Sequence, residues 1–190
     1  MRQRYGLPQD RTVFLYGGNL GHPQGIPFVI ECLRKTAADP DAFFLIIGSG
    51  AYAPALREFL ERDKPGNVML LNELPKEEYD HLAAACDVGL IFLDHRFTIP
   101  NFPSRLLIYL QAGLPVLAAT DPVTDLRDAI RDGDLGKWCE SDDADAFAAL
   151  VRELCESDLT AYAPRVREYV QTHYSAQTAC RAITDFLGAR

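Results

Sequence analysis

The stretch FPSRLLIYLQAGLPVLA, residues 102–118, decides the fold of this 190-residue chain. Its apolar run at 104–112 predicts a short helix, which Gly113 and Pro115 end because both residue types interrupt helices. The apolar run at 116–119 follows at once and predicts a buried strand. This order places a helix N-terminus beside a strand edge, where free N–H groups and Arg105 suit a phosphate or diphosphate.

Short apolar runs alternate with longer amphipathic runs along most of the chain. The apolar runs predict six strands, at residues 12–16, 43–47, 68–71, 88–92, 116–119 and, more weakly, 137–139. They are nearly continuous, which is typical of a parallel sheet that is covered on both faces. The amphipathic runs predict helices at 27–38, 54–62, 76–85, 104–112 and 123–131, and then at 143–155, 159–173 and 176–189. The predicted fold is α/β: a doubly wound, mostly parallel, six-stranded Rossmann-like sheet with C-terminal helices.

Length and composition indicate one globular domain that spans residues 1–190. The formal net charge of −8 argues against unspecific nucleic-acid binding, which requires clustered Lys and Arg. No apolar run approaches the roughly 18–20 residues that a membrane span needs. The five cysteines lack any CxxC spacing, and the four histidines lack metal-ligand spacing. We therefore expect reduced thiols, a cytoplasmic protein, and no bound metal or other cofactor.

Open parallel sheets bind their ligands beyond the carboxyl ends of the strands, so the loops there are candidate binding segments. The loop after the first predicted strand, GGNLGHPQG at residues 17–25, has four glycines in nine residues. Glycines allow positive φ and a close approach of the backbone to a ligand, although this spacing fits neither GxGxxG nor a P-loop. The loop is predicted to be a diphosphate cradle or a wall of an interdomain cleft; the alternative is a flexible turn. Its candidate residues are Gly17, Gly18, Asn19 and Gly21.

Two further strand-end loops hold candidate residues of a nucleotide pocket. Gly48 and Ser49 follow the second predicted strand, where the alternative is a plain strand-to-helix turn. Leu74 and Pro75 precede the third predicted helix, where they can pack against a base while the main chain pairs with its edge. The alternative there is an ordinary helix-entry loop with a hydrophobic contact.

The fourth candidate segment is the start of the helix within the opening stretch. Pro103 and Ser104 lie at its first turn, where Ser104 is predicted to cap the helix. Arg105 is predicted to meet phosphate oxygens, and its alternative is a solvated side chain. Asp94, at the end of the fourth predicted strand, is the nearest carboxylate.

The order of these motifs resembles the C-terminal, donor-binding domain of GT-B glycosyltransferases, in particular retaining family 4, the glycosyl transferases group 1. The resemblance covers residues 12 to about 186. It implies binding of a nucleoside-diphosphate sugar as donor substrate, and transfer of the sugar to a glycan, lipid or small acceptor. It also implies that Arg105 stabilises the leaving diphosphate and that the backbone of residues 72–75 holds the base.

The resemblance further implies that this chain is the C-terminal half of a longer two-domain protein. The acceptor side then belongs to a missing N-terminal domain, and the isolated half is expected to bind nucleotide weakly and to catalyse nothing. The last predicted helix is expected to lack a packing surface in the absence of that domain. Polysaccharide biosynthesis and a place at the inner face of the cell membrane are consistent with this family, and membrane association is left open.

The chain departs from the family pattern at four positions. Basic residues near the start and end of the glycine-rich loop are replaced by Asn19 and Gln24. Two glutamates that family members carry eight positions apart correspond here to Pro100 and Ile108, and Asp94 is the nearest substitute. Each unpaired ribose hydroxyl costs about 1–3 kcal/mol on burial, so two would weaken donor binding about a hundredfold.

Three interpretations of the lost glutamates remain. The protein is a divergent transferase that holds its donor differently, a transferase for an unusual donor, or a GT-B binding or scaffold module without catalysis. A GT-B UDP-sugar 2-epimerase is a further alternative with the same fold. Titration of the chain with UDP, GDP and ADP distinguishes a scaffold, which binds none of them, from an enzyme. Analysis of the products of the full-length protein distinguishes a transferase from an epimerase.

Overall fold

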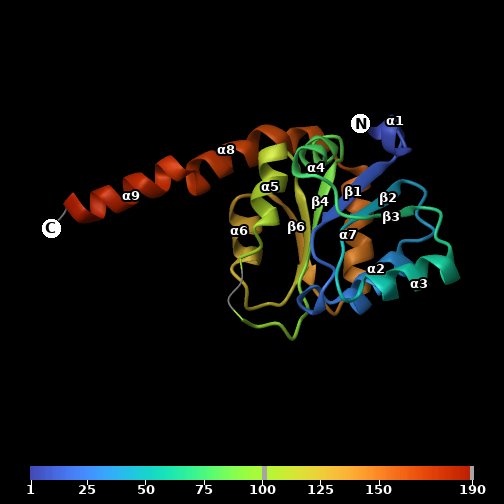
Figure 1. The fold of residues 1–190 in the computed structure, drawn as a ribbon. Helices are drawn as coiled ribbons and strands as arrows, with labels where there is room; N and C mark the ends of the chain where they lie inside the picture. The colour runs from blue at the N-terminus through green and yellow to red at the C-terminus, as the bar shows by residue number, and fades with distance from the viewer. Residues whose placement is uncertain (100–101, 189–190) are drawn as a thin grey trace.

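The computed structural model describes residues 1–99 and 102–188. Its sheet has the strand order β3-β2-β1-β4-β5-β6, and every neighbouring pair is parallel. The strands are β1 (Thr12–Gly17), β2 (Ala42–Ile47), β3 (Val68–Leu71), β4 (Val88–Phe92), β5 (Val116–Thr120) and β6 (Gly136–Glu140). The order reverses between β1 and β4, which makes this a topological switch point (Figure 1). The predicted doubly wound, Rossmann-like sheet is confirmed.

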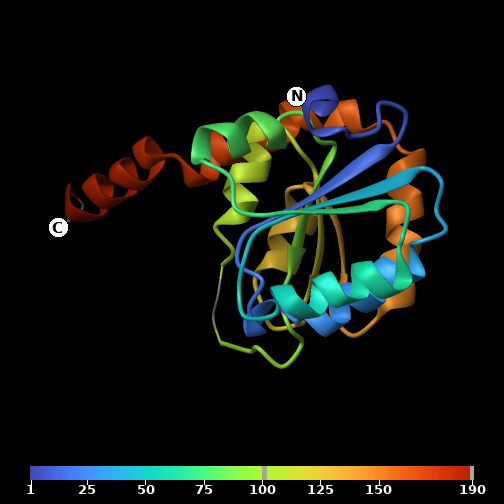
Figure 2. The ribbon, with the colours of Figure 1, turned by 45° about the vertical axis from the view of Figure 1, so that its right-hand side comes forward.

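Helices cover both faces of the sheet (Figures 1 and 2). One face packs against α2 (Ile26–Lys35), α3 (Ala53–Asp63) and α7 (Ala144–Glu156). The other face packs against α4 (Lys76–Ala83), α5 (Arg105–Ala112), α6 (Leu126–Asp132) and α8 (Tyr162–Tyr174). A short helix, α1 (Arg2–Tyr5), precedes the sheet, and α9 (Ala176–Gly188) follows α8.

The two faces form two separate hydrophobic cores because alternate residues of a strand point in opposite directions. In β1, Phe14 and Tyr16 join the core that contains α2, α3 and α7. Val13 and Leu15 join the core that contains α4, α5, α6 and α8. All four side chains are buried. This double burial explains why the strands read as continuous apolar runs in the sequence.

One predicted helix begins later than its sequence pattern suggests. The helix expected at 123–131 starts only at Leu126. The carboxylate of Asp121 accepts hydrogen bonds from the backbone N–H groups of Val123 (2.9 Å) and Thr124 (3.0 Å). These bonds hold a turn that competes with the helix, as Asp side chains commonly do.

The last helix, α9, extends away from the sheet (Figures 1 and 2). None of its described residues is buried, and Ile183, Phe186 and Leu187 are 60%, 63% and 63% exposed. The helix thus presents an uncovered apolar face, as predicted, while Ala189 lies outside the described residues. Among the helices of the described part of the chain, none combines the length and apolar character needed to cross a membrane.

Candidate functional site

A pocket of about 380 Å³ opens at the carboxyl ends of β1, β2 and β3. It is lined by Gly17, Gly18, Asn19, Ile47, Gly48, Glu73, Leu74, Lys76, Tyr79 and Ile108. These residues come from the first three predicted strand-end loops, from α4 and from α5. The pocket therefore lies where a doubly wound sheet places its ligand.

The first two loops approach each other as closely as glycine permits. The N–H of Gly18 donates to the carbonyl of Ile47 (2.9 Å), which holds the first loop against the end of β2. A Cβ on Gly48 would overlap the carbonyl oxygen of Gly18, and Gly48 has a φ of 155°. Only glycine tolerates both this short distance and this positive φ, so the pocket wall requires glycine at position 48 of the Gly-Ser-Gly sequence after β2.

Arg105 lies directly behind the first loop. Its guanidinium stacks on the ring of Tyr16, 4.5 Å from the centroid, and a Cβ on Gly18 would lie 2.9 Å from Nη2. Its Nη1 is buried and has no hydrogen-bond partner among the described residues. Within residues 1–99 and 102–188, no carboxylate forms an ion pair with Arg105.

The charge of Arg105 persists in this setting. Burial acts to lower the pKa of its guanidinium, but the neighbouring phenols of Tyr16, Tyr109 and Tyr79 more than offset this and leave the pKa raised. Buried charges are normally paired, because an unpaired one loses its hydration without compensation. Arg105 is therefore a cation that no described carboxylate neutralises, and its buried Nη1 is a donor without a described acceptor.

Tyr109 ties helix α5 to the end of β1. Its hydroxyl accepts a hydrogen bond from the N–H of Gly17 (3.0 Å), and its side chain is fully buried. Burial raises the pKa of Tyr109 well above its ordinary value, and burial also raises the pKa of Tyr79. Both phenols thus stay neutral at physiological pH, and they frame Arg105 without cancelling its charge.

The start of α5 differs from the prediction in one respect. Ser104 occupies the N-cap position, but its side chain makes no capping hydrogen bond, so the predicted cap is wrong. The residue has helical φ and ψ instead of the extended conformation that a capping side chain requires. The backbone carbonyl of Pro103 accepts the N–H of Leu106 (3.0 Å). Pro100, which corresponds to the first lost glutamate, lies outside the described residues.

Seven of the twelve sequence candidates are not among the residues that line the pocket, namely Gly21, Ser49, Pro75, Asp94, Pro103, Ser104 and Arg105. The N–H of Gly21 turns to the side chain of Gln24 (3.1 Å) in a local turn, and Pro75 precedes α4 on the wall of another hollow. Both carboxylate oxygens of Asp94 bond to the guanidinium of Arg96 (2.8 Å each). These hydrogen bonds from Arg96 are the main reason that the pKa of Asp94 is lowered to about 2. Asp94 therefore does not take the place of the lost glutamates in this pocket.

Sequence reasoning missed three polar residues of the pocket, namely Glu73, Lys76 and Tyr79. It searched for a replacement carboxylate close to α5, whereas Glu73 comes from the loop after β3. Parallel strands bring these loops to one edge of the sheet, so a search over all strand ends would have found it. Ile108, which replaces the second glutamate, does line the pocket and is 37% exposed.

No metal centre accompanies the pocket within the described ranges. There, no group of three or more His, Cys, Asp or Glu side chains is arranged to hold a metal ion. His22 lies edge-on to Tyr52, with ring centroids 5.9 Å apart, and His95 lies 3.9 Å from a carboxylate oxygen of Asp94. Neither histidine lines the pocket.

A doubly wound parallel sheet with a glycine-walled pocket at its carboxyl edge defines a Rossmann-like domain. The family model for glycosyl transferases group 1 matches residues 1–173. The chain belongs to this family.

Individual relatives support the same assignment. The chain is 28% identical over 167 residues to the protein of Pseudomonas aeruginosa described as probable glycosyltransferase WbjE, covering 88% of this chain and 42% of WbjE. Anabaena Alr3699/HepE in complex with UDP has the same fold, with a TM-score of 0.79 and 20% identity over 100% of this chain and 51% of HepE. The C-terminal domain of LpcC from Francisella tularensis has a TM-score of 0.71 at 16% identity, over 92% of this chain and 91% of that domain. The chain thus spans about half or less of the full-length relatives.

Proposed function

We propose that this chain is the donor-binding half of a glycosyltransferase that uses a nucleoside-diphosphate sugar. The observation that carries the proposal is the guanidinium of Arg105 behind the glycine-rich loop, because its buried Nη1 has no hydrogen-bond partner among the described residues. A diphosphate in the pocket supplies the negative charge that no described residue supplies. The family membership of the chain and the UDP bound by HepE support a nucleotide sugar as the source of that diphosphate.

In the proposed reaction, charge builds up on the diphosphate as the sugar leaves. Arg105 lies beside this position and forms charge-assisted hydrogen bonds that strengthen as the negative charge grows. The N-terminal end of α5 adds a positive dipole end, which falls off within the first turn. On the other wall, the backbone around Leu74 holds the base, and retention of configuration at the sugar is proposed from the family.

The acceptor side is assigned to a second domain. Because the chain spans 42% of WbjE and 51% of HepE, we place the acceptor-binding residues in an N-terminal GT-B domain of the whole protein. The uncovered apolar face of α9 is the surface on which that domain is proposed to pack. The isolated chain is accordingly expected to bind donor nucleotide weakly and to transfer no sugar. The cytoplasmic location, at the inner face of the membrane or free, stays a prediction.

Titration calorimetry of the 190-residue chain with UDP, GDP and ADP tests this proposal, with uridine, guanosine and adenosine as matched ligands that lack phosphate. At least one diphosphate is expected to bind, and its nucleoside is expected to bind far more weakly. Equal binding of nucleoside and diphosphate would contradict the role of Arg105. No binding of any diphosphate, even at millimolar concentration, would instead favour a scaffold module, which Ile108 in place of a carboxylate also suits.

A further inference from the structure

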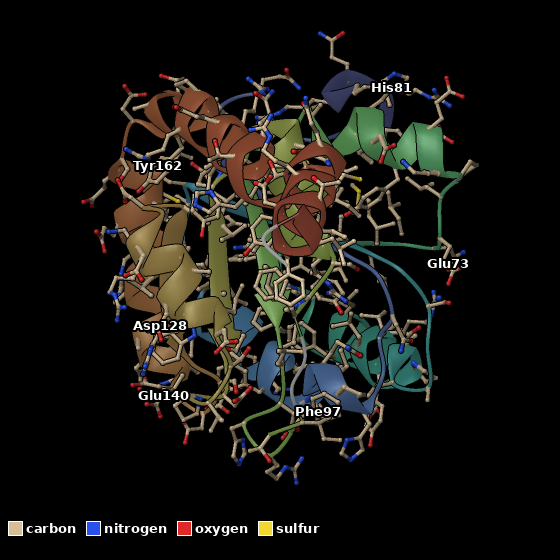
Figure 3. The ribbon with its side chains drawn as sticks, turned by 90° about the vertical axis from the view of Figure 1, so that its left-hand side faces the viewer. Glu73, His81, Phe97, Asp128, Glu140 and Tyr162 are labelled. Atoms are coloured by element: carbon tan, nitrogen blue, oxygen red, sulfur yellow. The ribbon has the colours of Figure 1, made fainter. Side chains whose placement is uncertain are left out.

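Relative to the family pattern, the pocket lacks the carboxylate expected on α5 but contains one on a neighbouring loop. Ile108 stands on α5 where relatives are expected to carry a glutamate, and it offers no acceptor to a ribose. Glu73, from the loop between β3 and α4, also lines this pocket. Asp128 and Glu140, by contrast, lie on the opposite side of the molecule from Glu73 (Figure 3).

Glu73 is held in place by the neighbouring loop. The hydroxyl of Ser49 donates a hydrogen bond to Oε1 of Glu73. Ser49 is in turn fixed by its carbonyl, which accepts the N–H of Leu20 from the glycine-rich loop (2.7 Å). The second carboxylate oxygen, Oε2, has no hydrogen-bond or ion-pair partner within residues 1–99 and 102–188. Glu73 thus presents one open acceptor on an anchored side chain.

Glu73 is connected to both segments that are proposed to hold the nucleotide. Leu74, whose backbone is proposed to hold the base, follows Glu73 in the chain. Ser49, to which the carboxylate is bonded, is tied to the glycine-rich loop that fronts Arg105 and the proposed diphosphate. The carboxylate of Glu73 is thus connected to the proposed base-binding segment through the chain and to the glycine-rich loop through Ser49.

The second charged side chain of the pocket does not neutralise Glu73. Lys76 also lines the pocket, but its ammonium group pairs with Asp80 one turn further along α4, at 2.5 Å. Lys76 therefore does not occupy the carboxylate of Glu73.

From this placement we propose that Glu73 is a specificity-determining residue that accepts hydrogen bonds from the ribose hydroxyls of the donor nucleotide. It would do from the β3–α4 loop what a glutamate at position 108 does from α5. This inference rests on the proposed function, since it needs a nucleoside diphosphate in the pocket. It predicts that the chain distinguishes ribonucleotides from 2′-deoxyribonucleotides through Glu73.

The experiment compares the Kd values of UDP and 2′-deoxy-UDP for the wild-type chain, Glu73→Gln and Glu77→Gln, or of the GDP pair where GDP binds better. Glu77 is an exposed carboxylate on α4 that does not line the pocket, so E77Q matches the charge change. The ratio of the two Kd values is the readout, because it cancels the general effect of removing a negative charge near a diphosphate. Thermal melting of both variants verifies that they are folded.

The wild-type chain and E77Q are expected to prefer the ribonucleotide by about tenfold, and E73Q to lose most of that preference. An unchanged ratio in E73Q would overturn the inference while leaving the proposed function intact. A change in E73Q that alters only the choice between UDP and GDP would overturn it in favour of base recognition. If the wild-type chain binds no nucleoside diphosphate at all, the proposed function itself fails, and this inference fails with it.

Discussion

Two hollows of nearly equal size lie along the carboxyl edge of the sheet, and they differ in how their polar groups are satisfied. The first is the pocket of about 380 Å³ beside β1–β3, where the buried Nη1 of Arg105 has no described partner. The second, of about 390 Å³, is lined by Thr98, Ile99, Phe102, Asp121, Val123, Thr124 and Asp125. There the carboxylate of Asp121 already accepts two backbone N–H groups. Volume alone does not separate the two, whereas the buried, unsatisfied Nη1 of Arg105 lies beside the first.

The largest effect is expected from closing the wall of the first pocket with Gly48→Ala. The added Cβ overlaps the carbonyl of Gly18, and a φ of 155° is strained for any side chain. The two loops must separate, so we expect a loss of about 2–4 kcal/mol in the free energy of unfolding and no measurable nucleotide binding. Urea unfolding and calorimetry measure these two quantities.

The matched control for this change is Gly66→Ala, because a Cβ on Gly66 meets nothing within 4 Å and its φ is not positive. We expect its stability and nucleotide binding to stay close to those of the wild-type chain. Equal losses in both variants would show that the close approach of the two glycine loops does not matter.

Arg105→Gln tests the unpaired charge itself. Loss of about two charge-assisted hydrogen bonds is expected to weaken diphosphate binding about a hundredfold. The free energy of unfolding is expected to remain equal to or above that of the wild-type chain, because a buried cation without a partner is removed. Binding and stability therefore change in different directions, as calorimetry and chemical unfolding of the same preparation will reveal.

Asp121→Ala is the counterpart of this change in the second hollow. Removal of the Asp121 carboxylate leaves two backbone N–H groups without their acceptor, so the free energy of unfolding is expected to fall by about 1–2 kcal/mol. Nucleotide binding is expected to stay unchanged. If nucleotide binding were weaker in D121A than in R105Q, the nucleotide would bind in the second hollow, and the assignment to the first would be wrong.

Ile108→Glu sharpens the comparison by adding a carboxylate to the first pocket. Ile108 is 37% exposed, so a charged side chain remains hydrated at this position. Two new acceptors for ribose hydroxyls are expected to tighten nucleotide binding about tenfold. Val123→Glu adds the same charge to the second hollow, at a residue that is 68% exposed, and is expected to have no effect. Weaker binding in I108E would mean that the ribose does not lie against α5.

The sequence allowed the sheet to be predicted almost completely, because its strands are buried on both faces. Phe14 and Val13 point into different cores, so neither face interrupts the apolar run with polar residues. The parallel topology then placed Gly18, Gly48 and Leu74 at one edge, and all three line the pocket. These features follow from strand periodicity and chain order alone.

The polar part of the site was harder to predict because it depends on side-chain direction. Asp94 ends a strand, as expected of a site residue, but its neighbour Arg96 takes up both carboxylate oxygens. Glu73 lies in the loop whose backbone is predicted to hold the base, but the sequence does not indicate that its side chain bonds to Ser49 of the neighbouring strand-end loop. Side-chain pairs between residues far apart in the chain cannot be recognised from the sequence, whereas the spacing of the glycines can.

The smallest effect is expected from Asp94→Asn, which removes a satisfied carboxylate of this edge outside the first pocket. The pKa of Asp94 is lowered from 3.8 to about 2, mainly by the hydrogen bonds from Arg96. A carboxyl group whose folded-state pKa is depressed adds stability above its unfolded-state pKa, and this stability is lost as the pH falls toward the folded-state value. The window for Asp94 therefore runs from about pH 4 down to about pH 2.

Because Arg96 is 66% exposed, solvent screens the pair, and the contribution of Asp94 is expected to be about 1 kcal/mol. D94N should thus unfold about 1 kcal/mol more easily at pH 6, and the difference should shrink toward pH 2. Urea midpoints of D94N and the wild-type chain across this pH range measure the difference.

Nucleotide binding at neutral pH is expected to be unaffected by D94N, since both oxygens of Asp94 already have partners and Asp94 does not line the pocket. A loss of binding in D94N comparable to that in R105Q would show that a satisfied carboxylate can matter as much as an unsatisfied cation, and would undo the distinction between the two regions.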